Sequence, residues 1–263
     1  MAGPIRHAVD MTLTTLSVDC GGTGLKALLL GEAGEQLGER VRIPTPYPLA
    51  PELFVSELVN LTASLGRFDR VTVGMPGMIR HGVVVSTPHY STLAGPFTPV
   101  DQVLANRWRG FDAQAALTHA FGRPTRVFND AEVQGAAVVR GHGVELVLTL
   151  GTGLGSAIFD EGALAPHLEL SHHPLCHGQT YDQQLGNRAR KDGSRKRWVR
   201  RVRAAVQTLR PVVYFDHLYL GGGNSKHLPD DFGPDVTIVA NTAGLLGGVR
   251  AWDLEAWQGS GRP

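Results

Sequence analysis

The chain has 263 residues, of which 42% are hydrophobic and 19% are charged, enough for one large domain or for two smaller lobes with cores of their own. A formal net charge of +1 excludes a global electrostatic attraction to nucleic acid or to a membrane surface. Two cysteines far apart in sequence, and no apolar run long enough to span a bilayer, favour a soluble cytoplasmic protein.

The apolar periodicity predicts strands and helices in alternation. Strands are expected near 13–18, 25–30, 38–43, 70–75 and 82–86, with a helix near 51–65 and an irregular stretch from Thr87 to Trp108. A helix near 112–121, a strand near 125–128, a helix near 131–140 and strands near 145–150 and 154–160 follow. Helices near 179–191 and 194–212, strands at 216–220 and 236–239 and a helix near 243–256 complete the chain. This order predicts two α/β lobes.

Two glycine-rich loops, at 20–24 and 151–155, each lie between apolar runs of strand length. They therefore predict hairpin turns rather than the strand-to-helix turn of a Walker or Rossmann site. Glycines let backbone N–H groups approach phosphate oxygens, while Asp19 can hold Mg²⁺ directly or through water. An ordinary turn is the alternative for either loop alone. The predicted phosphate-donor residues are Asp19, Gly21, Gly22, Thr23, Gly24, Lys26, Gly151, Thr152 and Gly153.

Asn129 and Asp130 stand between the two loops, after a predicted strand and before a predicted helix. Phosphoryl transfer to a hydroxyl needs a carboxylate that accepts the hydroxyl proton. Asp130 is the candidate base. The alternative is that either residue only caps the helix, but the position between two phosphate loops favours catalysis and predicts a phosphotransferase.

With these motifs the chain resembles the ROK family of sugar kinases in the actin-like ATPase superfamily, and within it the polyphosphate- or ATP-dependent glucokinases. Further matches in the family's order are 73–78, 106–108, 169–172, 221–226 and 241–248. The resemblance implies two actin-like (ribonuclease H-like) lobes with a substrate cleft between them. The N-terminal α/β lobe is expected at 1–111, joined by a C-terminal helix at about 243–263, and the C-terminal α/β lobe at 112–242. The resemblance also suggests a homodimer.

A hexose is gripped by planar groups that bind adjacent hydroxyls. The resemblance assigns this work to Asn106, Asn129, Asp130, Glu169 and His172. Ser171 stands where the family has glycine, and the segment that follows is short where the family has another sugar-binding glutamate. Asp182 is the stand-in for that glutamate. The alternative for His172 is a surface histidine among its histidine neighbours.

Gly222, Gly223 and Asn224 follow a predicted strand, and the resemblance places them near a nucleotide; a tight turn is the alternative. Many ROK proteins hold zinc with one histidine and three cysteines. This chain has only Cys176 and His177 there, so zinc is unlikely unless His172, His173, Cys176 and His177 converge.

The segment 188–203 holds nine arginines and lysines, with Trp198, Val199 and Val202 between them. This pattern predicts an amphipathic helix whose charged face is solvated. The alternative is a docking track for inorganic polyphosphate, in which case glutamine at Arg197, Arg200 and Arg201 weakens polyphosphate use and spares ATP use.

Together these features predict a hexose kinase, a glucokinase or polyphosphate-glucose phosphotransferase. It transfers a phosphoryl group from polyphosphate, ATP or both to the 6-hydroxyl of glucose with Mg²⁺. The alternatives are a kinase for fructose, mannose or an N-acetylhexosamine, or a non-catalytic sugar-binding or regulatory ROK protein. Regulators carry an N-terminal helix-turn-helix domain, for which the residues before Met11 are too few, so DNA is not expected as a partner. A membrane is not expected either, because no apolar run is long enough to span a bilayer. The intact Asp19, Thr23, Asp130 and Thr152 argue against a catalytically dead relative.

Overall fold

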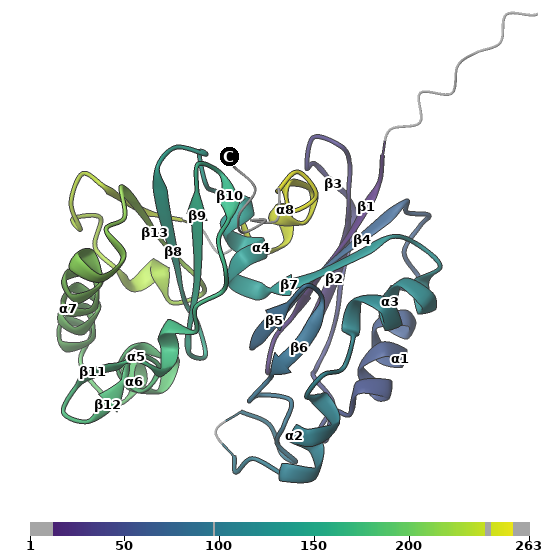
Figure 1. Cartoon of the computed structure of the whole chain (residues 1–263), viewed down its shortest axis with the longest axis horizontal. Helices are drawn as coiled ribbons and strands as arrows, with labels where there is room; N and C mark the ends of the chain where they lie inside the picture. Colours follow the sequence, from purple (N-terminus) through teal and green to yellow (C-terminus); the bar gives the residue numbers. More distant parts are fainter. Residues whose placement is uncertain (1–12, 97, 240–242, 255–263) are drawn as a thin grey trace, which may run out of the picture.

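The computed structural model describes residues 13–96, 98–239 and 243–254, which form two α/β lobes (Figure 1). The first sheet has the order β3-β2-β1-β4-β7 and the second the order β10-β9-β8-β13-β14. The first contains β1 (Thr15–Cys20), β2 (Leu25–Leu30), β3 (Gln36–Ile43), β4 (Arg70–Met75) and β7 (Thr125–Asn129). The second contains β8 (Val144–Leu150), β9 (Leu154–Asp160), β10 (Ala163–Leu164), β13 (His217–Gly221) and β14 (Val236–Ile238).

The two sheets repeat one topology. In each, a central strand pairs antiparallel with the next strand of the chain through a glycine hairpin, and that strand pairs antiparallel with an edge strand. On its other side the central strand is followed by two parallel neighbours. Both glycine loops are therefore hairpin turns, as predicted, and each occupies the same place in its sheet.

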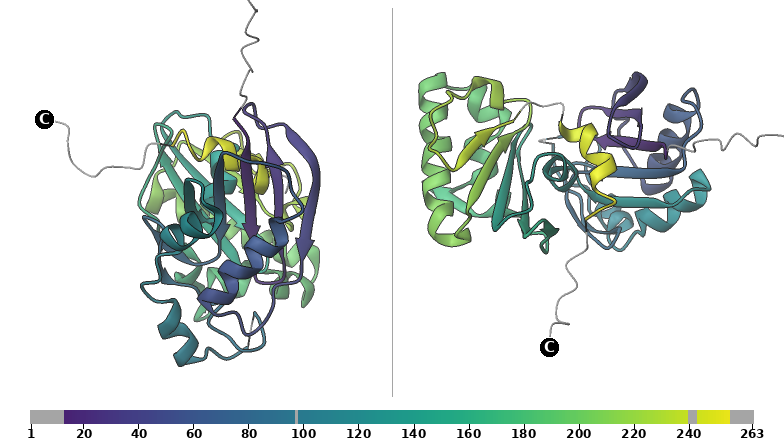
Figure 2. Two further views of the ribbon diagram at one scale, coloured as in Figure 1. Left: turned by 90° about the vertical axis from the view of Figure 1, so that its right-hand side faces the viewer. Right: turned by 90° about the horizontal axis from the view of Figure 1, so that it is seen from above.

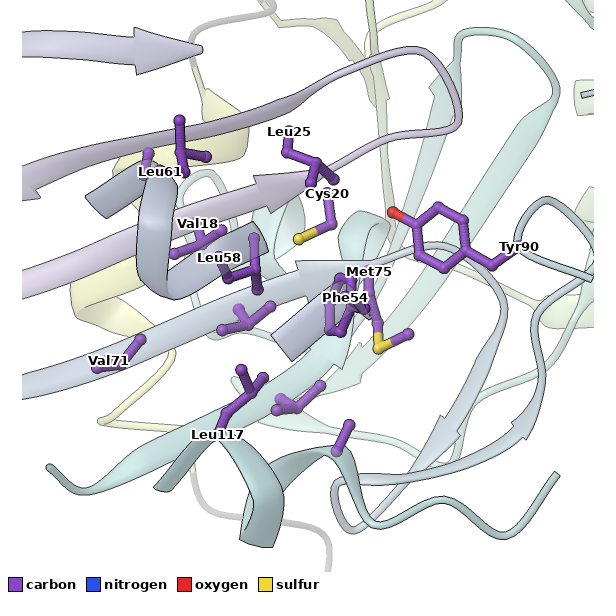
Figure 3. Close-up of a cluster of buried hydrophobic side chains, with 14 of the residues drawn as sticks. Val18, Cys20, Leu25, Phe54, Leu58, Leu61, Val71, Met75, Tyr90 and Leu117 are labelled. Carbon is purple, nitrogen blue, oxygen red and sulfur yellow. The ribbon is translucent and has the colours of Figure 1, made fainter. Parts of the chain in front are cut away.

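Alternation along β1 separates the core from the cleft. Leu16, Val18 and Cys20 are buried in the main hydrophobic core, which Figure 3 shows together with Phe54 of α1 (Pro51–Thr62). Because side chains alternate across a strand, Asp19 faces the other side of the sheet. Helix α3 (Ala113–Phe121) completes the core on the side of α1.

Helices cover the second sheet on both faces. Helix α7 (Arg195–Val213) buries Trp198, Val202 and Leu209 against one face. Helix α4 (Asp130–Ala136) follows β7 of the first sheet and packs against β8 and β9 from the other face. The chain thus crosses from the first lobe to the second at Asn129 and Asp130.

Helix α8 (Ala243–Arg250) lies between the lobes and contacts α4 and β1 (Figures 1 and 2). The Thr72 hydroxyl of β4 donates to the Gly248 carbonyl at 2.6 Å, so this C-terminal helix is fixed to the first sheet. The sheet pairing places β7 in the first lobe, whereas the sequence boundary at 111 and 112 assigns it to the second.

Several short elements differ from the predictions. Helix α2 (Gln102–Trp108) lies in the stretch expected to be irregular and is capped by Asp101, whose side chain accepts from Leu104 N. In place of the helix expected at 179–191, the structure has β12 (Gln179–Thr180), α5 (Tyr181–Leu185) and α6 (Asn187–Lys191). The two helices are separate because Gly186 between them is extended, with ψ 169°. The helix expected to reach 140 ends at Ala136.

The remaining elements are β5 (Met78–Arg80), β6 (Val83–Ser86), η1 (Leu170–His172), β11 (Pro174–Cys176) and η2 (Ser225–His227). The expected strand near 82–86 is the second strand of the β5–β6 hairpin. The last expected helix ends at Arg250, and its residues 255 and 256 lie outside the described part of the chain. In the described part, every helix is too short or too polar to cross a membrane.

Candidate active site

Two adjoining cavities open where the lobes meet. The larger, of about 800 Å³, is bounded by both glycine loops, and the smaller, of about 200 Å³, by the Asn129–Asp130 turn and the segment around Glu169. The residues that line both are Gly21, Gly22, Asp130, Thr149, Gly151 and Thr152. Two molecules, one bound in each cavity, would therefore contact each other next to Asp130.

The first glycine loop is held from behind. Gly21 N donates to Gly24 O at 2.9 Å and closes the hairpin. The hydroxyls of Thr45 and Tyr47 donate to the carbonyls of Gly21 and Gly22 at 2.7 and 2.8 Å. Since these contacts fix the loop in place, the part of the larger cavity that the loop lines is already formed before any ligand binds.

The second glycine loop is held in the same way. Asn187 N at the start of α6 donates to the carbonyls of Gly151 and Thr152 at 3.0 and 3.1 Å. The side chain of Asn224, predicted to bind the donor, also donates to Gly151 O at 2.9 Å and lines neither cavity. Gly222 has φ +83°, and a Cβ there would lie 2.6 Å from the backbone of Leu150, so this position requires glycine.

Asp130 is the first residue of α4, and Asn129 is its cap. The Asn129 side chain accepts from Ala131 N at 2.8 Å and donates to Gly77 O at 2.8 Å. Asn129 caps the helix, which leaves the Asp130 carboxyl with one hydrogen bond within the described chain, accepted from Ala131 N at 3.0 Å. The same carboxyl lines both cavities. Burial, then the charge of Asp19, raises its pKa to about 7, against the Ala131 hydrogen bond.

A buried chain of charges lies behind Asn129. Glu132 accepts from Asn129 N at 2.9 Å through Oε2, and its Oε1 lies 3.1 Å from Nδ1 of His167. Nε2 of His167 lies 3.5 Å from Oε2 of Glu169. Burial lowers the pKa of His167, but hydrogen bonds and charge from Glu132 and Glu169 outweigh it and raise the pKa to about 9. His167 thus lies between Glu132, which holds the Asn129 turn, and Glu169.

Sequence reasoning missed Glu132 and His167 as parts of the site. The spacing of Asn129 and Glu132 is that of a capping box, which the structure forms, so Glu132 could have been found. No local pattern distinguishes His167 from its histidine neighbours. His89, Pro88 and Gly77 also line the smaller cavity and were not predicted.

Four predicted sugar residues besides Asp130 line the smaller cavity: Asn129, Glu169, His172 and Asp182. Burial raises the pKa of Glu169, but the hydrogen bonds from His167 and Ser171 lower it by more, so that the net shift of this pKa is downward. Asp182 accepts from Leu154 N at 2.9 Å, which ties it to the second loop. Asn106 is different: it is exposed on α2, near Arg109, and lines neither cavity.

Asp19 and Lys26 line the larger cavity and form an ion pair at 2.6 Å. Mg²⁺ is bound in proteins through one or two carboxylates, substrate phosphates and water. Asp19 and Asp130 are the carboxylates that line the larger cavity, which fits that requirement. Because Asp130 is the predicted base, Asp19 is the residue that would hold the ion. Within residues 13–96, 98–239 and 243–254, no three His, Cys, Asp or Glu side chains gather as a metal cluster, the histidines around Cys176 included.

The basic segment lies away from both cavities. Arg197, Arg200 and Arg201 belong to α7, which covers the face of the second sheet opposite α4. None of the three lines either cavity. The helix is amphipathic as predicted, since Trp198, Val202 and Leu209 are buried and Arg197 and Arg200 are exposed.

The repeated sheets, the paired hairpin loops and the cleft between them define the two-lobed, actin-like fold. Residues 15–167 match the ROK family, and the chain belongs to this family, as the motifs predict. It is similar to the polyphosphate glucokinase of Mycobacterium tuberculosis, with 25% identity over 250 residues that cover 89% of each chain. The N-acetylmannosamine kinase of Escherichia coli is 31% identical over 181 residues, 62% of this chain and 57% of that protein.

Solved structures show the same fold. The inorganic polyphosphate/ATP-glucomannokinase from Arthrobacter sp. strain KM has a TM-score of 0.75 and 30% identity, covering 92% of this chain and 99% of that one. A ROK family glucokinase from Streptomyces griseus has a TM-score of 0.69 and 20% identity, covering 91% and 98%; this second likeness concerns the fold alone.

Proposed function

We propose that this protein is a hexose kinase that transfers a phosphoryl group from polyphosphate, ATP or both to the 6-hydroxyl of glucose. The observation that carries the proposal is the place of Asp130, which lines both cavities and has a pKa raised to about 7. A carboxyl group near half-ionisation at neutral pH is suited to general-base catalysis. The Asp130 carboxyl borders one cavity of about 200 Å³, which we assign to the sugar, and one of about 800 Å³, which we assign to the phosphate donor.

The hexose occupies the smaller cavity. Asn129, Glu169, His172 and Asp182 offer amide, carboxylate and imidazole groups to its hydroxyls. Nε2 of His167 lies 3.5 Å from Oε2 of Glu169, and Ser171 donates to Oε1 of Glu169; both lower the pKa of Glu169 and favour its charged form. The 6-hydroxyl then points toward Asp130, the residue common to the two spaces.

The donor lies in the larger cavity, with its terminal phosphate between the two glycine loops. The Asp130 carboxylate accepts the proton of the 6-hydroxyl as the sugar oxygen bonds to phosphorus, and the bond from phosphorus to the donor's bridging oxygen breaks. Backbone N–H groups of the loops and Lys26 stabilise the charge on the leaving phosphate. Mg²⁺, when bound at Asp19, neutralises further charge on the donor.

Both donors remain in the proposal because the names of similar proteins include each. The mycobacterial relative is a polyphosphate glucokinase, and the Arthrobacter structure is a polyphosphate/ATP-glucomannokinase. The latter name also supports mannose as a second sugar. Ser171, which replaces the expected glycine, lines the smaller cavity and donates to Glu169 Oε1 at 2.6 Å, so it alters the proposed sugar pocket.

The test is a coupled assay of glucose, mannose, fructose and N-acetylmannosamine, each with ATP and separately with polyphosphate. We expect turnover with glucose, with mannose as the next best sugar. Absence of turnover with every pair, while glucose still raises the melting temperature, would favour the non-catalytic sugar-binding protein instead.

A further inference from the structure

Three cationic side chains lie on the cleft-facing side of the first sheet. Asp19 of β1 is opposite Lys26 of β2, and Lys26 is opposite Arg42 of β3. Arg40 precedes Arg42 by two residues and lines the same cavity as Lys26, so it lies on this side as well. The intervening Val41 packs toward the hydrophobic core on the other side. Lys26, Arg40 and Arg42 thus form a cationic row beside the first glycine loop.

The cationic row borders the proposed donor space. Lys26 and Arg40 line the cavity of about 800 Å³. The guanidinium of Arg42 lies against the loop itself, since a Cβ placed on Gly24 would stand 3.1 Å from its Nε. The row therefore extends from the loop along β3, away from Asp130.

The two arginines lack a counter-charge. Lys26 is paired with Asp19, whereas the side chains of Arg40 and Arg42 form no hydrogen bond or ion pair with any residue of the described chain, and both residues are exposed. Like charges directly opposite each other destabilise a sheet, and Lys26 and Arg42 occupy such a pair of positions, although Asp19 offsets the charge of Lys26. An anion bound across the row would relieve this repulsion.

We propose that Arg40 and Arg42 bind inorganic polyphosphate and hold the phosphates of the donor chain that lie beyond the transferred one. The inference rests on the proposed kinase function and assigns its donor. Polyphosphate carries charge along its whole length, which suits guanidinium groups that bind phosphate through paired hydrogen bonds. The adenosine of ATP is uncharged and offers such groups no equivalent partner.

This site differs from the docking track considered for α7. Both would bind the same polyanion, but Arg40 borders the donor cavity, whereas Arg197, Arg200 and Arg201 line neither cavity. A donor chain whose end lies between the glycine loops reaches the β3 arginines first. The two assignments therefore predict opposite results for two sets of variants.

The experiment compares Arg40→Gln/Arg42→Gln with Arg67→Gln, an exposed arginine of the same lobe that lines neither cavity. The α7 variant Arg197→Gln/Arg200→Gln/Arg201→Gln is the rival arm, and Arg40→Lys/Arg42→Lys tests whether charge alone suffices. KM is measured for long-chain polyphosphate and for ATP at several salt concentrations. Binding of fluorescently labelled polyphosphate is measured by anisotropy without sugar, so that it needs no turnover.

For the β3 double variant we expect KM for polyphosphate and the anisotropy Kd to rise about tenfold or more, with KM for ATP changed less than about threefold. The slope of log Kd for polyphosphate against log salt concentration should become smaller by about one to two. Arg40→Lys/Arg42→Lys should recover part of the lost affinity. An unchanged Kd and KM, an equal loss with ATP, or a loss confined to the α7 variant would overturn the site.

Failure of the kinase proposal has a different signature. If no sugar is phosphorylated with either donor but the β3 variant still loses polyphosphate binding, the binding site stands and the kinase function falls. If sugars are phosphorylated with ATP while the wild-type protein shows no anisotropy change with polyphosphate, the kinase stands and this inference falls.

Discussion

Nδ1 of His167 lies 3.1 Å from Oε1 of Glu132, and only 2% and 5% of the two side chains are exposed. Glu132 uses its other oxygen to hold the backbone of Asn129, and His167 faces Glu169 on its far side. The pair therefore links the turn that carries the proposed base to a proposed sugar ligand. A buried charge of this kind is tolerated only while its partners are present.

His167→Gln removes the cation and leaves Glu132 and Glu169 facing each other without it. We expect the free energy of unfolding to fall by about 3 kcal/mol, measured by urea denaturation at pH 6. The folded pKa of about 9 exceeds the ordinary value of 6.5, so the stabilisation is complete below pH 6.5 and is lost as pH rises through 9.

The matched control is His167→Gln/Glu132→Gln, which removes both charges of the pair and should recover part of the lost stability. A difference between wild type and His167→Gln that stays constant from pH 6 to pH 10 would contradict a buried histidinium. The surface variant His119→Gln, on the exposed side of α3, should leave stability within about 0.5 kcal/mol of wild type.

The rate should depend on pH through Asp130. With its pKa at about 7 in the free enzyme, the carboxyl is protonated below that pH and cannot accept a proton. We therefore expect kcat/KM for glucose to fall about tenfold for each pH unit below about 6.5. A profile that stays flat down to pH 5 would show that another group is the base, or that the base has an ordinary carboxyl pKa.

The same carboxyl should limit stability. Its folded pKa is raised above the usual 3.8, so the folded state binds this proton more tightly, and stability declines as pH rises from 4 through 7. Asp130→Asn should therefore be more stable than wild type at pH 8, by up to about 4 kcal/mol, and equal to it near pH 4. Calorimetry at both pH values measures this, and a less stable variant at pH 8 would refute the destabilising charge.

Local pattern was enough to predict the hairpin loops and most strands. Loop 20–24 lies between two runs that are almost wholly buried in β1 and β2, and the apolar character of both runs is visible in the sequence. The site residues nearest these loops were found for the same reason. Asn129 and Asp130 follow a strand and open a helix, and both line the sugar-sized cavity.

What depends on distant contacts could not be predicted. His167 enters the site because the chain folds back on Glu132, 35 residues earlier. Arg42 faces the cleft because β3 pairs with β2 in one register, and that register includes an irregularity between Ala27 and Leu29. Asn106 was assigned through the resemblance alone, and its place on an exposed helix face depends on how α2 packs against β6.

The central claim is that Asp130 transfers a proton while the donor phosphoryl group moves to the sugar. Its most direct test is ³¹P NMR of the product formed from glucose by wild type and by Asp130→Asn, with Asp160→Asn, an exposed aspartate that lines neither cavity, as control. We expect glucose 6-phosphate from wild type and control. Asp130→Asn should form it at a rate about 10²- to 10⁴-fold lower while still binding glucose. Turnover by Asp130→Asn within a few fold of wild type would contradict it.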